Sequence, residues 1–227
     1  MVGTDNYDRL SALGQRQSRL LARTLADRGI RPRLILSGGL IRQRETAEIL
    51  REMMSIDQPS IDQPDVDSQG GIDPRWNEFD YRGAIVAARP DYADRAVQRA
   101  DLARYPDPVA AFNDVFTEAT ARWLGGSHDE HYAEPFPDFL VRVEAALAAT
   151  LAQLDDGEIA LVVTSAGVIS TLAAVLLDGG TLTWQRINAC LANTGFTSVV
   201  ASSAPQLLTL NEHPHLDIGE PDLLTYR

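Results

Sequence analysis

The residues best suited to chemistry in this 227-residue chain stand at two junctions between an apolar run and a turn of small residues. Residues 34–36 lead into Ser37, with Arg42 a few positions further on, and residues 160–163 lead towards Ser165. A junction of this kind directs several backbone N–H groups, and the positive end of a helix dipole, at one spot. Phosphate is the usual occupant of such a spot, and a guanidinium adds a fork of donors that suits its oxygens. We therefore predict that Ser37, Arg42 and Ser165 bind phosphate.

Glu78 is the candidate catalytic residue of the predicted site, in the role of a proton donor. It stands in the aromatic-rich segment of residues 74–81, where burial could raise its pKa into the range of a general acid. An ordinary surface carboxylate is an equally good interpretation of Glu78. Structural alternatives also exist for Arg42, which could be a solvated helix residue, and for Ser165, which could simply cap a helix.

The elements that must position these residues alternate between strands and helices. Apolar periodicity predicts helices at 11–28, 40–53, 109–124, 137–154 and 168–177, and strands at 33–36, 158–163, 197–201 and 206–210. This order predicts an α/β fold, a three-layer α/β/α arrangement around a mostly parallel central sheet, with ligands bound beyond the carboxyl ends of the strands. We predict a single domain over residues 1–227, with a helical insertion at about 82–134 and a surface loop at 55–74.

Composition and charge exclude several classes of function. The net charge of −12 argues against a nucleic-acid partner and against an anionic membrane surface, because both require a basic face. All 20 basic residues are arginine, so lysine chemistry is excluded; Arg44 and Arg51 are expected to be ordinary surface charges. Cys190 is the only cysteine, which excludes a disulfide framework. The chain shows no apolar run of membrane-spanning length and no signal peptide, so we expect a cytoplasmic protein.

Two further constellations were weighed as alternatives to phosphate chemistry. His128 and His131 suggest metal ligands by composition, but they follow Gly-Gly and precede proline, so we predict a polar loop, and no metal and no cofactor. The order Ser165, Asp178, His213 would suit a serine hydrolase of the α/β type, although the first glycine of the nucleophile elbow is missing. We keep this hydrolase as a remote alternative, and we predict a structural or exposed role for His213 and His215.

Five segments in a fixed order resemble the histidine phosphatase superfamily, whose fold is phosphoglycerate mutase-like. They are residues 7–17, 37–47 with Arg42, 77–79 with Glu78, 164–169 with Ser165, and 210–216. The resemblance implies hydrolysis of phosphomonoesters without a cofactor, and a phosphorylated small molecule or inorganic phosphate as the ligand. It also implies that Arg42 holds the phosphoryl group and that Glu78 protonates the leaving oxygen. The oligomeric state does not follow from it.

The chain departs from the family pattern at two places. The nucleophilic histidine of an N-terminal Arg-His-Gly motif is missing, and Ser165 stands where the family has its second histidine. The strand that carries the motif is central in the family's sheet, so its absence is expected to leave neighbouring strand edges open. We expect phosphatase activity in a full-length form that begins upstream, and little or none in the chain itself. The alternative is a non-catalytic, phosphate-binding or interaction protein, a pseudophosphatase.

Overall fold

The computed structural model describes residues 8–55, 71–220 and 222–226, and these fall into two compact units. One unit contains residues 79–142, and the other contains the described residues up to 78 together with those from 143 onwards. Most of the predicted surface loop at 55–74, namely residues 56–70, lies outside the described residues.

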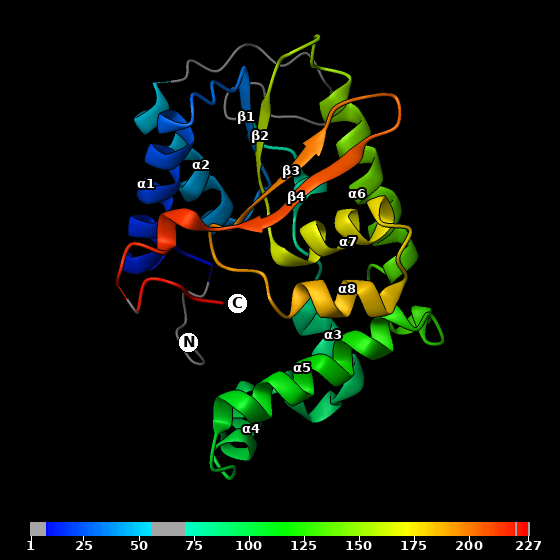
Figure 1. Ribbon diagram of the computed structural model, residues 1–227. Helices are drawn as coiled ribbons and strands as arrows, with labels where there is room; N and C mark the ends of the chain where they lie inside the picture. Colours follow the sequence, from blue (N-terminus) through cyan, green and yellow to red (C-terminus); the bar gives the residue numbers. More distant parts are fainter. Residues whose placement is uncertain (1–7, 56–70, 221, 227) are drawn as a thin grey trace. The chain divides into compact units, whose positions relative to one another are not determined.

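The larger unit is a three-layer α/β/α arrangement. Figure 1 shows helices α1 and α2 on one side of the strands and helix α7 on the other. The elements of this unit are α1 (Ala12–Asp27), β1 (Leu34–Ser37), α2 (Ile41–Met54), η1 (Pro74–Trp76), the later part of α6 (Phe136–Leu151), β2 (Ala160–Val163), α7 (Ala166–Leu176), α8 (Thr181–Asn188), β3 (Phe196–Val200), β4 (Gln206–Glu212) and η4 (Pro214–Leu216).

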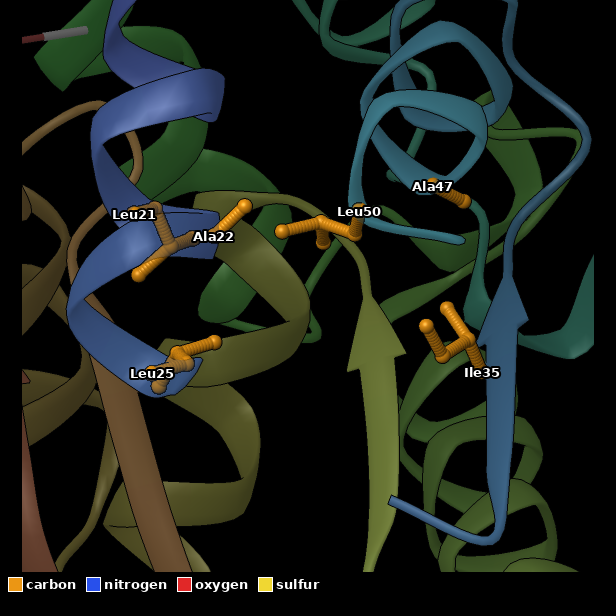
Figure 2. Packing of buried hydrophobic residues seen from close by; sticks show 6 residues of the cluster. All are labelled: Leu21, Ala22, Leu25, Ile35, Ala47 and Leu50. Atoms are coloured by element: carbon orange, nitrogen blue, oxygen red, sulfur yellow. The ribbon is translucent and has the colours of Figure 1, made fainter. Parts of the chain in front are cut away.

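Strands β1 and β2 pair in parallel, and their side chains alternate between the two helical layers. Ile35 packs into a cluster with Leu21, Ala22, Leu25, Ala47 and Leu50 of α1 and α2, as Figure 2 shows. Its strand neighbours Leu34 and Leu36 pack instead with Ala160, Val162 and Leu154 on the opposite face. This period of two buries both faces of β1, as a strand inside a layered α/β fold requires.

Within the described residues, the strands form two separate two-stranded sheets. β2 pairs with β1, and β3 pairs with β4 in antiparallel fashion, but within the described residues no ladder joins β2 to β3. All four residues of β2 are half-buried, whereas all four of β1 are buried. The expectation of open edges beside a missing central strand stays a prediction.

The smaller unit is helical and is built around an aromatic cluster. It contains α3 (Tyr81–Ala88), η2 (Pro90–Ala93), α4 (Arg95–Leu102), α5 (Pro108–Leu124), η3 (Asp129–His131) and the beginning of α6. Phe79 stacks on Trp123 with ring centroids 4.5 Å apart, and Phe139 meets both rings edge-on. The guanidinium of Arg142 lies over Phe139 and forms two hydrogen bonds, of 2.6 and 2.8 Å, with Glu134. The predicted insertion at 82–134 lies inside this unit.

The predicted elements agree with the observed ones to within a few residues, and the fold class is confirmed. Ser11 caps α1 as predicted, because its hydroxyl accepts a hydrogen bond of 3.1 Å from the Gly14 N–H. The sequence analysis missed the short helices α3, α4 and α8. None of the helices in the described part of the chain has both the length and the apolar character needed to cross a membrane.

His215 is a structural residue of the larger unit, as predicted, and burial controls its protonation. Its ring is 3% exposed, and Nε2 lies 3.0 Å from the Thr194 hydroxyl. Burial lowers the pKa of His215 to about 4, and the nearby positive charges of His213 and Arg28 act in the same direction. In the native state His215 therefore stays neutral at pH values where the same side chain is protonated in the unfolded chain.

The first prediction concerns acid sensitivity. Neutral His215 contributes stability above about pH 6.5, and this stability is lost as the pH falls towards 4, because only the unfolded chain binds the proton. We expect His215→Gln to reduce the acid-induced loss of unfolding free energy between pH 7 and 4.5 by roughly 2–3 kcal/mol. Urea unfolding at each pH measures this difference.

The matched control is His128→Gln, which removes an exposed histidine from the smaller unit. We expect this variant to follow the unmodified protein at every pH. An acid response of His215→Gln that equals that of the unmodified protein would contradict the assignment.

Candidate phosphate-binding site

The turn between β1 and α2 forms the first half of the site. Ser37 ends β1 opposite Val163 of β2, and the Gly38 N–H donates to the Val163 carbonyl at 3.1 Å. The next N–H, that of Gly39, donates to the Asn77 side chain at 2.6 Å. A side chain at position 38 would overlap Gln43, so the tight path of this turn depends on glycine. The Asn77 contact holds the turn in place as the chain enters α2.

Arg42 lies in the first turn of α2, and its guanidinium makes two contacts inside the larger unit. Nη1 donates to a carboxylate oxygen of Asp8 at 2.9 Å, and Nη2 lies 3.4 Å from the Ser165 hydroxyl. The side chain is 27% exposed, so it is held at the surface rather than extended into solvent. The structure thus brings together Arg42 and Ser165, two of the three predicted phosphate-binding residues.

Ser165 precedes helix α7, but its side chain does not cap it. No side-chain capping hydrogen bond is present, and the hydroxyl instead accepts a hydrogen bond of 2.8 Å from the Gln43 amide. Gln43 is buried, and the same amide nitrogen also reaches the Trp76 carbonyl at 3.3 Å. The interpretation of Ser165 as a simple N-cap is therefore wrong, because two donors on α2 turn the hydroxyl away from its own helix.

Glu78 contacts the beginning of α7, the helix that follows Ser165 in the chain. Its Oε2 accepts a hydrogen bond of 3.1 Å from the Gly167 N–H, which is one of the free donors of the helix start. The hydroxyl of Thr164 donates to the Trp76 carbonyl at 2.7 Å and holds the two segments together. Glu78 thus stands at the predicted site, where it acts as an acceptor in the observed contact. Its role as a proton donor stays a prediction.

Ser37 has a different position from the other predicted residues. It is fully buried, and within the described residues its hydroxyl has no hydrogen-bond partner. Its N–H donates a hydrogen bond of 2.9 Å to the Gly71 carbonyl, and its carbonyl accepts one of 2.8 Å from the Asp73 N–H. No contact joins its hydroxyl to the other two predicted residues, so phosphate binding by Ser37 stays a prediction.

Three residues of the site were missed by the sequence analysis. Asp8 contacts Arg42, Gln43 contacts Ser165, and Asn77 holds the turn before α2. Gln43 could have been found, because it follows Arg42 directly on the predicted helix. Asp8 and Asn77 gave no signal, because their partners are 33 to 38 residues away in the chain.

The two other arginines of α2 differ from each other. Arg44 is exposed, as expected for a surface charge. Arg51 is half-buried, and its Nη2 donates to the Ile35 carbonyl at 2.9 Å, so the expectation of an ordinary surface charge is wrong for it. Burial lowers the pKa of Arg51, because the charged form loses water there. Arg51 therefore joins α2 to β1, the two elements on either side of the Gly38–Gly39 turn.

His128 and His131 belong to the smaller unit, and none of the hydrogen bonds of the described residues joins them to Arg42. His128, Glu130 and His131 offer ligand atoms within 4.8 Å of one another, on and beside the short helix η3 of the smaller unit. Arg122 lies 2.5 Å from Nδ1 of His131, and a guanidinium there opposes a second cation. The prediction of no metal site stays a prediction, and this contact supports it.

The remote serine-hydrolase alternative is wrong in the form considered. Ser165 precedes α7 and Asp178 follows it, so the helix of 11 residues separates them by roughly 16 Å at 1.5 Å per residue. His213 is bonded through Nδ1 to the Asn211 carbonyl at 2.7 Å. In a catalytic triad one imidazole bonds to both the serine and the acid, and a separation of roughly 16 Å between Ser165 and Asp178 is too long for that.

A family model and several solved structures match this chain. The family model described as histidine phosphatase superfamily (branch 1) matches residues 101–213, a range that contains Ser165 but neither Arg42 nor Glu78. No curated protein sequence matches the chain significantly.

Solved structures of phosphatases share the fold over most of the chain. A mycobacterial glucosyl-3-phosphoglycerate phosphatase is 20% identical, with 90% of this chain and 89% of that chain covered and a TM-score of 0.54. A putative α-ribazole-5′-phosphate phosphatase from Escherichia coli is 22% identical, with 90% and 84% covered and a TM-score of 0.55. A phosphoserine phosphatase from Entamoeba histolytica is 14% identical, with 92% and 86% covered and a TM-score of 0.56.

The family match and the shared fold confirm the resemblance seen in the sequence motifs. The chain is similar to the histidine phosphatase superfamily over residues 101–213, and its three-layer fold is phosphoglycerate mutase-like.

The second prediction tests the turn before α2. Gly38→Ala places a methyl group against the Gln43 side chain and 2.8 Å from Asn77 Oδ1, so it disturbs the residues that hold Ser165 and the turn. We expect Gly38→Ala to weaken binding of inorganic phosphate at least fivefold, as measured by isothermal titration calorimetry.

Gly39→Ala is the matched control, because the nearest atom to its methyl group is 3.6 Å away. We expect its phosphate affinity to stay within twofold of the unmodified protein. Equal affinity for all three proteins would show that the path of the turn is irrelevant to binding.

Proposed function

We propose that the chain binds the phosphate group of a phosphorylated small molecule, or inorganic phosphate, where the helices α2 and α7 begin. The observation that carries this proposal is the convergence of the Arg42 guanidinium and the start of α7 on one hydroxyl, that of Ser165. A guanidinium beside helix N-terminal N–H groups is an arrangement that binds phosphate. Arg42 would bind the phosphate oxygens through two parallel hydrogen bonds, and Ser165 would add a neutral one.

Complexes of related folds support a phosphate-type ligand. The mycobacterial glucosyl-3-phosphoglycerate phosphatase has been solved with inorganic phosphate, at 21% identity and a TM-score of 0.55. The Entamoeba histolytica protein was solved with phosphoserine as a variant in which a histidine is replaced by alanine. In that relative, a phosphorylated ligand is bound without the replaced histidine. The same separation of binding from histidine chemistry is proposed for this chain.

The chain is proposed to lack a phosphorus nucleophile. Of its four histidines, His128 and His131 belong to the smaller unit, while His213 and His215 lie beside β4 and η4. In the described part of the chain, none of the four is bonded to Arg42 or Ser165. Covalent catalysis at phosphorus requires a nucleophile within contact distance of the bound phosphate. Little or no phosphatase activity is therefore expected from the chain itself.

A form of the protein with an upstream Arg-His-Gly motif would be a phosphomonoester hydrolase built on the same site. In that form Glu78 would protonate the leaving oxygen, after release of its hydrogen bond with Gly167. The alternative is a pseudophosphatase, a cytoplasmic phosphate-ligand-binding or interaction module. The charge of −12 favours a small-molecule ligand over nucleic acid or a membrane in both cases. The intact mass of the protein purified from its native cells separates these two forms.

The third prediction concerns turnover. We expect the 227-residue chain to hydrolyse p-nitrophenyl phosphate no faster than its Arg42→Ala variant, because neither has a nucleophile that could attack the bound phosphorus. Release of p-nitrophenol by both purified proteins, followed by absorbance, measures this. Hydrolysis by the unmodified chain that Arg42→Ala abolishes would contradict the prediction.

The fourth prediction concerns binding. Arg42→Ala should weaken the binding of phosphate or orthovanadate at least tenfold, because the charged donor fork is lost. Arg44→Ala is the matched control: it removes the same charge from the same helix, but from an exposed position two residues further on. Isothermal titration calorimetry compares the two variants, and equal affinities for both would remove Arg42 from the site.

A further inference from the structure

A carboxylate of the chain already occupies part of the proposed phosphate site. One oxygen of Asp8 accepts a hydrogen bond of 2.9 Å from the Ile41 N–H, at the start of α2. The other oxygen accepts one of 2.9 Å from Nη1 of Arg42. Asp8 thus uses a helix N-terminal N–H and a guanidinium together, which are the donors that a phosphate group would use.

We propose that Asp8 is an internal anion that competes with the ligand phosphate for Arg42 and is displaced when the ligand binds. This inference rests on the proposed function and adds a regulatory element to the same site. In the free protein Asp8 holds Arg42 in place. In the bound protein the phosphate takes the guanidinium, because it carries more negative charge and more acceptor oxygens than a carboxylate.

The energetics permit such an exchange. The side chain of Asp8 is 36% exposed and that of Arg42 is 27% exposed, so solvent screens their attraction. Ion pairs in exposed positions contribute little to stability, and a ligand phosphate can therefore break this one. Retaining both anions on Arg42 would place two negative charges side by side, which opposes binding. The apparent affinity is therefore the intrinsic affinity multiplied by the fraction of protein in which the Asp8–Arg42 contact is open.

The chain around Asp8 is anchored independently of Arg42. The Leu10 N–H donates to Glu45 of α2 at 2.8 Å, and Arg9 lies 3.5 Å from the same carboxylate. Helix α1 then begins after its cap at Ser11. Asp8 can therefore release Arg42 by a change in its own side chain and local backbone, while Glu45 keeps the segment against α2.

A neutral substitution separates the charge of Asp8 from its capping role. Asp8→Asn keeps an oxygen that can accept from the Ile41 N–H, but it removes the negative charge that competes for Arg42. Glu45→Gln is the matched control, since it removes a carboxylate that holds the same segment without a contact to Arg42. Titration calorimetry with inorganic phosphate and with orthovanadate reports the affinity of each variant. Circular dichroism verifies that each is folded, and Asp8→Ala provides a second test of the same position.

We expect Asp8→Asn and Asp8→Ala to bind phosphate at least threefold more tightly than the unmodified chain. Glu45→Gln should stay within twofold, and Asp8→Asn should give no gain when it is combined with Arg42→Ala. An affinity for Asp8→Asn that is equal to or weaker than that of the unmodified chain overturns the exchange, as does a gain that persists without Arg42. If neither the unmodified protein nor any variant binds phosphate or orthovanadate, the proposed function fails together with the exchange. If the unmodified chain binds phosphate and Asp8→Asn does not bind it more tightly, only the exchange fails.

Discussion

The parallel register of β1 and β2 is the constraint on which the site depends. Because Ser37 lies opposite Val163, both strands end at the same level, and the helices that follow begin next to each other. Arg42 of α2 can then reach Ser165 at the start of α7, although 123 positions separate them in the chain. A register shifted by one residue would turn Ile35 out of its core cluster, so the same packing that stabilises the fold also aligns the site.

The Gln43–Ser165 contact joins position 43 of α2 to position 165, directly before α7. The resemblance to the family implies a histidine at position 165. Here both positions are polar and joined by a hydrogen bond of 2.8 Å, and Gln43 also holds the Trp76 carbonyl. A buried amide costs free energy unless it is hydrogen-bonded, and this pair meets that need. The result is an ordered site with less positive charge than a histidine would provide.

The sequence predicted those parts of the structure that depend on local pattern. Residues close together in the chain determine the two junctions, the alternation of β1 and β2, the cap at Ser11 and the hairpin of β3 and β4. The contacts made by Asp8 and Asn77 could not be predicted, because they exist only after α2 has packed beside distant segments. The side-chain contacts of Ser165 could not be predicted for the same reason: a serine before a helix often caps it, but here Gln43 and Arg42 provide competing donors.

Under the proposed function, binding and turnover would depend on different parts of this fold. Arg42, Ser165 and the start of α7 are positioned by β1, β2 and α2, none of which requires a strand between the two sheets. The nucleophilic histidine of the family, by contrast, belongs to that central strand. A form without that strand would lack the nucleophile, while the groups proposed to hold the phosphate would keep their support. Binding can persist where turnover does not, because the two depend on different strands of the sheet.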